Sequence, residues 1–445
     1  MKSLLVSISG VRGVVGEGLT PDVALRYALA FGNYCKGGKV FLGRDTRTSG
    51  EMLRGAVVCG LLAAGCDVVD MGICPTPTVG IVAEELRAYG LVITASHNPI
   101  QWNGLKFIGK DGIFLSQKQV EKLKRMVQNS MFPYKSWNRM GKLRVSELLI
   151  LKHISKVLRL RYIREQRIRK RKLQVVLDCN NGAGSEIAGM LLKVLGCRII
   201  ELNSKPCGTF AHPAEPLPQN IRMLCQKVKK TKADIGFALD PDGDRLAVVS
   251  DKGVPLGEEN TLALAARFVL GKNPGNMAIN VSTSKIMEEI AKEFGVKVFR
   301  TKVGEAFVAK KLKRVKGVIG GEGNGGVILP ELNSGRDALG GMALILEYLA
   351  ESRKTISELS KELPSFHMVK KKIGIKGDLN PKLKKLENRF KNVKINRVDG
   401  LRLDFSDSWL HIRKSNTEAA VRIIAEAKSK GMANKLANKA INILK

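Results

Sequence analysis

Aromatic residues and long apolar runs are scarce in this chain of 445 residues. Only 5% of the residues are aromatic, so the cores must rest on Val, Leu, Ile and Ala. The longest uncharged apolar stretch, Gly55–Cys66, is well short of the ~20 residues that cross a bilayer. The N-terminal apolar run is brief and is followed by Arg12, unlike a signal peptide. We therefore expect no membrane association and no secretion.

Paired cysteine motifs are also missing. None of the eight cysteines belongs to a C-x-x-C pair, and several lie inside apolar runs, as reduced core thiols do. This pattern predicts neither disulfides nor a zinc site and favours the cytoplasm. The cysteines are Cys35, Cys59, Cys66, Cys74, Cys179, Cys197, Cys207 and Cys225.

Acidic residues are few beside the basic ones. The 41 Asp and Glu stand against 75 Lys and Arg, a formal net charge of +34 that would attract nucleic acid or small phosphorylated molecules. The densest basic run, Lys156–Lys172, has apolar residues spaced for a linker helix with one buried stripe. No aromatic platform accompanies the run, so a nucleic-acid partner is not expected.

Three segments repeat an order of strand, polar loop, helix, glycine and strand: Val40–Met71, Val175–Leu202 and Met277–Phe299. Each predicts a βαβ unit, with Gly65, Gly196 and Gly295 at the left-handed position that ends a helix. From about Phe366, short strands precede an Ala-rich C-terminal helix. The expected fold class is α/β, with three βαβ-type domains of mixed sheets and a smaller C-terminal α+β domain.

Three carboxylates crowd one turn between two apolar strands, in the sequence DPDGDR. Asp240, Asp242 and Asp244 alternate with Pro241 and Gly243, which fold the chain back and aim the carboxylates at one centre. Hard oxygen ligands at this density suit Mg²⁺. An EF-hand loop is excluded, because strands flank the turn and no glycine stands at its sixth position.

A second polar loop, TASHNP, follows the apolar strand that begins at Leu91. Ser96 stands at the carboxyl end of that strand with His97 and Lys106 nearby, and its hydroxyl is a candidate nucleophile or phosphate carrier. The serine-hydrolase motif G-x-S-x-G is absent, which argues against that enzyme class. A loop in which Ser96 merely caps a turn stays an alternative on this segment alone.

Two loops are rich in groups that bind anions. Arg413–Arg422 combines guanidinium, hydroxyl and amide groups ahead of an apolar strand, and Gly43–Gly50 opens the first crossover helix with two arginines. The glycine-rich run 320–326 contains Glu322, which suits sugar hydroxyls better than a phosphate.

Together and in this order, seven motifs resemble the α-D-phosphohexomutase superfamily across nearly the whole chain. They are SGVRG, GRDTRTSG, TASHNP with NGLKF behind it, DPDGDR, TKVGE, GEGNGG and RKSNTE. The resemblance implies four domains around one central cleft, which we place at residues 1–150, 151–255, 256–365 and 366–445. It further implies a phosphoserine at Ser96, with one Mg²⁺ held by its phosphate and the three aspartates.

The resemblance also assigns roles. Lys106 would be the general acid and base, with His97, Arg12 and Arg245 completing the catalytic group. The activity implied is an intramolecular transfer that interconverts hexose 6-phosphates and 1-phosphates through a bisphosphorylated sugar, which also serves as activator. The substrate would contact two groups of residues: Lys302, Gly304, Glu322 and Asn324, and Arg413, Ser415, Asn416, Thr417 and Arg422.

Departures from relatives are visible in two places. Asn324 and Gly326 stand where many relatives carry Ser and His, and the phosphate loop has Lys414 and Ala419 where Pro is common. Within the superfamily the motifs look most like those of phosphoglucosamine mutases, which implies glucosamine phosphate as substrate. Phosphomannomutase and phosphoglucomutase activities are the alternatives, and a non-enzymatic polyanion-binding protein is a distant one. The sequence makes no prediction of oligomeric state.

Overall fold

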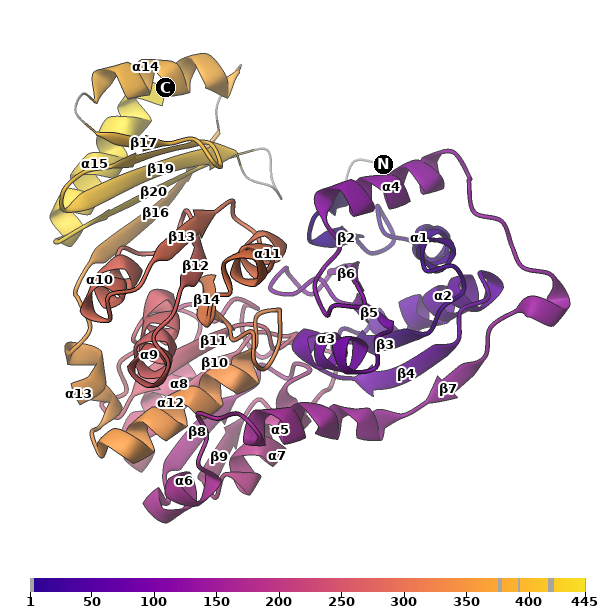
Figure 1. Cartoon of the computed structure of the whole chain (residues 1–445), viewed down its shortest axis with the longest axis horizontal. Coiled ribbons are helices and arrows are strands. Elements are labelled where there is room, and N and C mark those ends of the chain that lie inside the picture. The colour runs from indigo at the N-terminus through magenta and orange to yellow at the C-terminus, as the bar shows by residue number, and fades with distance from the viewer. Residues whose placement is uncertain (1–3, 375–377, 391–392, 415–419, 445) are drawn as a thin grey trace.

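The computed structural model describes residues 4–374, 378–390, 393–414 and 420–444, and within these ranges the chain forms four sheets with helices packed against them (Figure 1). The first sheet has the strand order β1-β2-β6-β5-β3-β4-β7. Its strands are β1 (Leu5–Ser7), β2 (Gly10–Val14), β3 (Val40–Arg44), β4 (Val68–Ile73), β5 (Tyr89–Ile93), β6 (Trp102–Ile108) and β7 (Leu143–Val145). Its helices are α1 (Pro21–Tyr34), α2 (Gly50–Ala63), α3 (Thr76–Glu85) and α4 (Gln117–Gln128), followed by the short turns η1 (Trp137–Arg139) and η2 (Glu147–Ile150).

Alternating side chains of β3 bind this sheet to helices on both faces. Val40 and Leu42 belong to the core formed with α1 and α2, whereas Phe41 belongs to the core that contains α3. Strands β3, β4 and β5 are parallel, while β6 is antiparallel to β5 and β2. The sheet is therefore mixed, as expected.

The second and third sheets share one plan, in which parallel strands are flanked by a single antiparallel edge strand. The second has the order β11-β10-β8-β9 and the third β13-β12-β14-β15. The second comprises β8 (Gln174–Asp178), β9 (Arg198–Leu202), β10 (Ile235–Leu239) and β11 (Leu246–Ser250), with α5 (Leu151–Leu158), α6 (Glu165–Arg171), α7 (Ser185–Val194) and α8 (Arg222–Thr231). The third comprises β12 (Met277–Asn280), β13 (Val298–Thr301), β14 (Ile319–Glu322) and β15 (Gly326–Ile328), with α9 (Glu258–Lys272), α10 (Ile286–Glu293), α11 (Glu305–Val315), α12 (Ala338–Ser352) and α13 (Ile356–Lys361).

The three predicted βαβ units are present. Strand pairs β3/β4, β8/β9 and β12/β13 are parallel and are joined by α2, α7 and α10. Gly65, Gly196 and Gly295 follow these helices with φ of 81°, 73° and 64°, the left-handed conformation that favours glycine.

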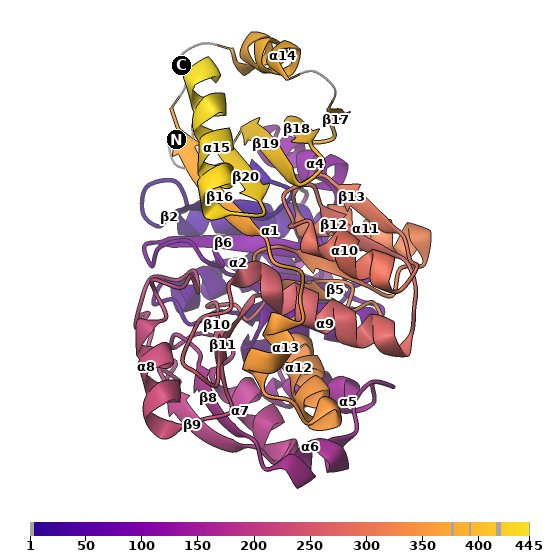
Figure 2. The same cartoon turned by 90° about the vertical axis from the view of Figure 1, so that its left-hand side faces the viewer.

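The C-terminal domain is antiparallel throughout and has its own core. Its order is β16-β20-β19-β18-β17, and its apolar cluster is separate from the one that runs through the first three domains. It lies at the opposite end of the molecule from the second domain (Figure 2). Its elements are β16 (His367–Ile373), α14 (Leu379–Arg389), β17 (Lys394–Asn396), β18 (Leu401–Asp404), β19 (Ser408–Lys414), β20 (Val421–Ala427) and α15 (Lys430–Leu444).

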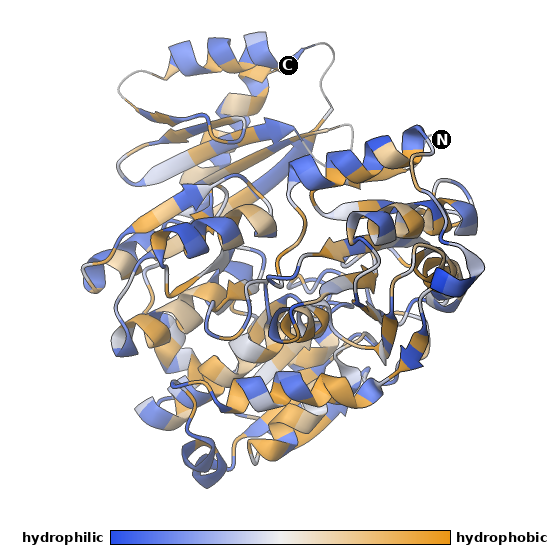
Figure 3. Ribbon diagram, turned by 45° about the vertical axis from the view of Figure 1, so that its right-hand side comes forward, coloured by the Kyte–Doolittle hydropathy of each residue, from blue (hydrophilic) through white to orange (hydrophobic). Residues whose placement is uncertain are grey.

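The basic run differs from the single linker helix that its pattern predicts. Two helices, α5 and α6, are separated by a turn at which Leu160, Tyr162 and Ile163 are buried. Burial of these side chains outweighs helix continuity, while the exposed residues of α6 are all polar. Hydrophilic and hydrophobic residues alternate along many of the helices of the molecule (Figure 3). Among the described residues, no helix combines the length and the apolarity that a bilayer crossing requires.

Candidate active site

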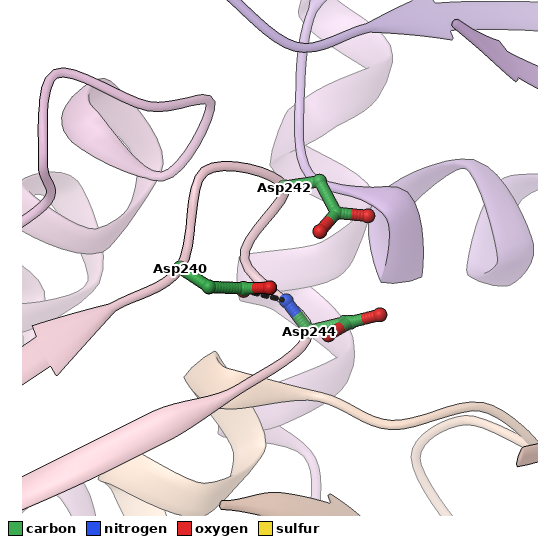
Figure 4. Close-up of side chains that lie close together, drawn as sticks. All are labelled: Asp240, Asp242 and Asp244. Carbon is green, nitrogen blue, oxygen red and sulfur yellow. Dashed lines mark hydrogen bonds between the residues drawn. The ribbon is translucent and has the colours of Figure 1, made fainter. Parts of the chain in front are cut away.

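The predicted carboxylate triad comes together on the turn between β10 and β11 (Figure 4). Asp240, Asp242 and Asp244 are fully buried, and one oxygen from each lies within 4.8 Å of the others. The Asp240 Oδ1 atom accepts hydrogen bonds of 3.0 Å from the backbone N–H groups of Asp244 and Arg245. These bonds fix the turn that clusters the carboxylates.

Each of Asp242 and Asp244 has one carboxylate oxygen that accepts hydrogen bonds from protein donors and one that accepts none from the described residues. Asp242 Oδ2 accepts from Thr76 Oγ1 and Lys106 Nζ, both at 2.5 Å, and Asp244 Oδ2 accepts from Arg336 Nη2 at 2.6 Å. The Oδ1 atoms of both aspartates are buried without a hydrogen-bond partner among the described residues. Because orphaned buried oxygens are costly, this arrangement fits a Mg²⁺ site.

Burial and charge set the protonation of the triad. Burial, followed by the neighbouring carboxylates Asp244 and Asp242, raises the pKa of Asp240 well above its usual range. Burial alone would also raise the pKa of Asp242, but the Lys106 ammonium outweighs it and keeps that pKa low. Conversely, burial would lower the pKa of Lys106, and Asp242 and Asp244 raise it instead.

Ser96 lies on the loop after β5 and faces the triad. Its Oγ atom is 3.1 Å from Asp240 Oδ2, and the residue is 1% exposed with a φ of 51°. This left-handed backbone is uncommon for serine, and such strain concentrates at functional sites. The Nδ1 atom of His97 is 3.4 Å from the same Oγ. Burial, aided by Arg245 and Arg12, lowers the pKa of His97 well below its usual value, so the imidazole is neutral.

Arg47 holds the Ser96 loop rather than an anion. Its guanidinium donates to the carbonyl oxygens of residues 96, 98, 99 and 102 at 2.6–2.8 Å, and its Nε donates to Asp45 at 3.0 Å. All five N–H donors are thereby used. The prediction that this arginine of GRDTRTSG binds an anion is wrong, because the loop it clamps takes every donor. Arg44 likewise pairs with Glu51 at 3.0 Å.

One cavity of about 420 Å³ joins Ser96 to all four domains. Arg12 and Arg245 line it beside Ser96. Arg12 Nη1 donates to Asn98 Oδ1 at 3.0 Å, and burial lowers the pKa of Arg12 to about 10. Arg245 pairs with Glu215 at 2.7 Å, and its Nη2 lies 3.5 Å from His97 Nε2. The cavity is therefore positively charged around the serine and suits a phosphate.

The C-terminal domain contributes Arg413 and Arg422 to the same cavity. Arg413 is 5% exposed, its Nε pairs with Asp399 at 3.1 Å, and its Nη2 is buried without a partner among the described residues. The predicted phosphate ligands Ser415, Asn416 and Thr417 lie outside the described residues.

The predicted sugar-binding segment ends β14. Glu322 Oε1 accepts from Asn280 Nδ2 at 2.8 Å and from the Gly304 backbone at 2.9 Å, and Asn324 lines the cavity with its Oδ1 unpartnered among the described residues. Lys302 is exposed and is not among the residues that line the cavity. The roles of all these residues stay predictions.

Sequence reasoning missed Arg336, Glu259 and Glu305, which also line the cavity. Arg336 fills the space beside Gly326, where a Cβ atom would lie 2.2 Å from Arg336 Cδ. The glycine at 326, where many relatives carry His, therefore leaves the space that the side chain of Arg336 occupies. Arg336 precedes α12 in a segment with no distinctive pattern, so no local signal marked it; Glu305 stands in the TKVGE motif and could have been found.

Family models match four successive segments of the chain. They describe the phosphoglucomutase/phosphomannomutase alpha/beta/alpha domains I, II and III, at residues 4–133, 151–253 and 258–366, and the C-terminal domain at residues 370–443. The chain belongs to the α-D-phosphohexomutase superfamily. The predicted family and fold class of this phosphohexomutase are confirmed. We retain 150, 255 and 365 as proposed domain boundaries.

Relatives of this phosphohexomutase carry two different names. A probable phosphoglucosamine mutase from Methanopyrus kandleri is 38% identical over 98% of this chain and 97% of its own length. A phosphoglucomutase/phosphomannomutase from Thermococcus kodakarensis is 39% identical, with the same shares covered.

Solved structures share the fold. A phosphoglucomutase/phosphomannomutase family protein from Burkholderia thailandensis has a TM-score of 0.84 at 29% identity, covering 99% of this chain and 96% of that one. The Aspergillus fumigatus N-acetylphosphoglucosamine mutase, solved with GlcNAc-6P and magnesium, has a TM-score of 0.59 at 16% identity over 99% and 95% of the two chains. At that identity, the second likeness shows the fold alone.

Proposed function

We propose that this phosphohexomutase interconverts glucosamine 6-phosphate and glucosamine 1-phosphate through a phosphoserine at Ser96. The position of Ser96 carries the proposal: its Oγ lies 3.1 Å from Asp240 of the triad, and the residue lines a cavity that reaches all four domains. A phosphoryl group on this oxygen would lie between the triad and the guanidinium groups of Arg12 and Arg245. Magnesium, when held by the three aspartates, supplies charge neutralisation for that group.

Two phosphoryl transfers complete the catalytic cycle. In the first, the bond from Ser96 Oγ to phosphorus breaks as a free sugar hydroxyl bonds to phosphorus and loses its proton. In the second, the other phosphate of the bisphosphorylated sugar returns to Ser96, and the sugar oxygen that it leaves gains a proton. The intermediate must turn over within the cavity between the two steps.

We assign both proton transfers to Lys106. Its ammonium lies at the triad, and the raised pKa that Asp242 and Asp244 give it keeps it protonated in the resting enzyme. For the two transfers to balance, Lys106 must lose its ammonium proton before the first of them. It then accepts the proton of the attacking hydroxyl and returns it to the departing sugar oxygen in the second transfer. His97 is neutral beside Ser96 and is positioned to orient the serine oxygen.

Carboxylates at the sugar end favour an amino sugar. Glu259 lies against Gly323, one of its oxygens accepts from the Ser284 backbone at 2.9 Å, and burial raises the pKa of Glu259 to about 8. Lys370 lines the same cavity and partly offsets this shift, and an ammonium substituent on the sugar would add a second cation that favours the ionised form of Glu259, which a hydroxyl would not. The name of the Methanopyrus kandleri relative agrees with this substrate.

Mannose and glucose phosphates form the second candidate class, favoured by the name of the Thermococcus kodakarensis relative. Steady-state kinetics on the 6-phosphates of glucosamine, mannose and glucose, each with its matching bisphosphate, decides between the classes. We expect the largest kcat/KM for glucosamine 6-phosphate. A larger kcat/KM for mannose or glucose 6-phosphate would contradict the substrate assignment and leave the phosphoserine mechanism intact.

Arg413→Ala should raise KM about tenfold or more and also lower kcat. The unpartnered Nη2 of Arg413 can bind the phosphate that is not reacting, and charge-assisted hydrogen bonds of this kind contribute about 1.5–3 kcal/mol each. The same anchor orients the reacting hydroxyl, so kcat falls as well. Arg397→Ala is the matched control, because Arg397 is an exposed arginine of the same domain that pairs with Glu387. An unchanged kcat/KM in Arg413→Ala would remove this residue from the substrate site.

A non-enzymatic polyanion-binding role remains the distant alternative. Purified protein that carries no phosphate by intact-mass analysis, has no mutase activity with any bisphosphate, and binds duplex DNA in a salt-dependent manner would favour it. We place the proposed activity in the cytoplasm, because buried thiols such as Cys35 and Cys179 suit a reducing compartment.

A further inference from the structure

Arg336 joins carboxylates from three separate parts of the cavity wall. Its Nη2 donates to Asp244 Oδ2 at 2.6 Å, its Nη1 to Glu322 Oε2 at 2.9 Å and its Nε to Glu305 Oε2 at 2.9 Å. The side chain is nearly buried and lines the cavity. One planar group thus contacts both the proposed metal site and the proposed sugar site.

The backbone around Gly326 is shaped for this arginine. A Cβ atom at position 326 would lie 2.2 Å from Arg336 Cδ and 2.9 Å from Arg336 Cγ. The guanidinium stem therefore occupies the volume that any side chain at the start of β15 would need. Arg336 in this position and a side chain at residue 326 therefore exclude each other, and this chain combines Arg336 with glycine at 326.

The contacts of Arg336 help to fix the orientation of the carboxylates in both sites. With its Oδ2 held by Arg336, Asp244 leaves its unpartnered Oδ1 for a cation. Glu322 is oriented from both sides, because Asn280 and Gly304 hold Oε1 while Arg336 holds Oε2. A guanidinium fork fixes the separation and the angle between two bound carboxylates, whereas a lysine ammonium is a single point charge.

We propose that Arg336 is a positioning residue that couples the two sites, so that occupation of the aspartate triad by a divalent cation strengthens binding of the sugar phosphate beside Glu322. The proposal rests on the proposed function only for the identity of the sugar. A cation bound to Asp244 would restrict the motion of that carboxylate and, through it, the motion of the Arg336 guanidinium. The guanidinium in turn restricts Glu322. Less conformational entropy is then lost when the sugar binds. Linkage requires the reverse effect to have the same size.

Charge neutralisation alone is the competing explanation, and Arg336→Lys separates the two. Lysine keeps the positive charge among Asp244, Glu305 and Glu322 but does not bridge them with fixed geometry. The readout is the affinity of dephosphorylated protein for Mn²⁺, by electron paramagnetic resonance, with and without saturating glucosamine 6-phosphate. We expect the sugar phosphate to tighten Mn²⁺ binding about fivefold or more in the wild type and by less than twofold in Arg336→Lys.

Arg267→Gln is the matched control, because Arg267 also bridges two carboxylates, Glu293 and Glu362, away from the cavity. It should retain the coupling of the wild type. Coupling absent from the wild type, or preserved in Arg336→Lys, would overturn the proposal. If glucosamine 6-phosphate does not bind, the same titration with mannose or glucose 6-phosphate tests the coupling, so failure of the substrate assignment is seen separately.

A double-mutant cycle tests the shared volume independently of binding. Gly326→His should lower Tm by about 2 °C or more in the wild-type background, because the imidazole meets the stem of Arg336. In the Arg336→Ala background the same histidine should cost distinctly less, because the obstructing atoms are gone. An equal loss in both backgrounds would show that Arg336 does not occupy the space of residue 326.

Discussion

Replacing Ser96 with alanine is expected to lower kcat by at least ~10⁴-fold, the scale seen when a covalent nucleophile is removed, while sugar phosphate still binds. The expectation follows from the geometry, because Ser96 Oγ donates to Asp240 of the triad and Ser96 lines the same cavity as Arg12 and Arg245. Without this oxygen no phosphate can be stored on the protein. Calorimetric titration with glucosamine 6-phosphate measures the retained binding, and a coupled assay measures turnover.

Backbone strain at Ser96 requires a second variant. Because φ is 51°, alanine keeps the left-handed strain whereas glycine relieves it, so Ser96→Gly should fold at least as well and be equally inactive. Ser9→Ala is the control, since Ser9 also lines the cavity but has no contact with the triad in the described structure. Intact-mass analysis should find one phosphate on the wild type and none on either Ser96 variant. Turnover by Ser96→Ala near the wild-type rate would rule out the phosphoserine mechanism.

Features that depend on neighbours in the sequence could be predicted from it. The three βαβ units follow from apolar strands, helix-period stretches and terminating glycines such as Gly65, all within about 30 residues. The triad follows for the same reason, because Asp240, Asp242 and Asp244 share one turn whose geometry Pro241 and Gly243 dictate. The Ser96 loop was found because a polar segment at the end of a buried strand is a local signal.

Features that depend on residues far away in the sequence could not be predicted in this way. The carbonyl groups that hold Arg47 belong to a loop about 50 residues away, and the partners of Arg336 lie 14 to 92 residues away. Nothing in the sequence around either arginine distinguishes an internal clamp from an anion site. The break between α5 and α6 has a similar cause, because burial of Leu160 and Ile163 against the rest of the core ends a helix that the local pattern would continue.

Removal of the divalent cation with EDTA should abolish turnover, and Asp242→Asn should lower both the cation affinity and kcat by at least ~100-fold. Asp242 Oδ1 is buried without a partner among the described residues, which marks it as a ligand atom, while Oδ2 is fixed by Thr76 and Lys106. An amide at this position loses the negative charge that attracts the cation. It also places an N–H₂ group either at the cation or against the Lys106 ammonium, and both contacts are unfavourable.

Isothermal titration with Mg²⁺ measures this effect directly and does not depend on activity. The control is Asp234→Asn, which removes an exposed carboxylate of the same domain whose Oδ2 accepts from the Gln174 backbone at 2.7 Å. It should bind Mg²⁺ like the wild type. Asp242→Asn should also become less sensitive to EDTA at its residual rate, because the variant no longer holds a cation for the chelator to remove. Full activity of the EDTA-treated wild type would show that the triad serves Lys106 and Arg336 as a structural counter-charge and holds no catalytic cation.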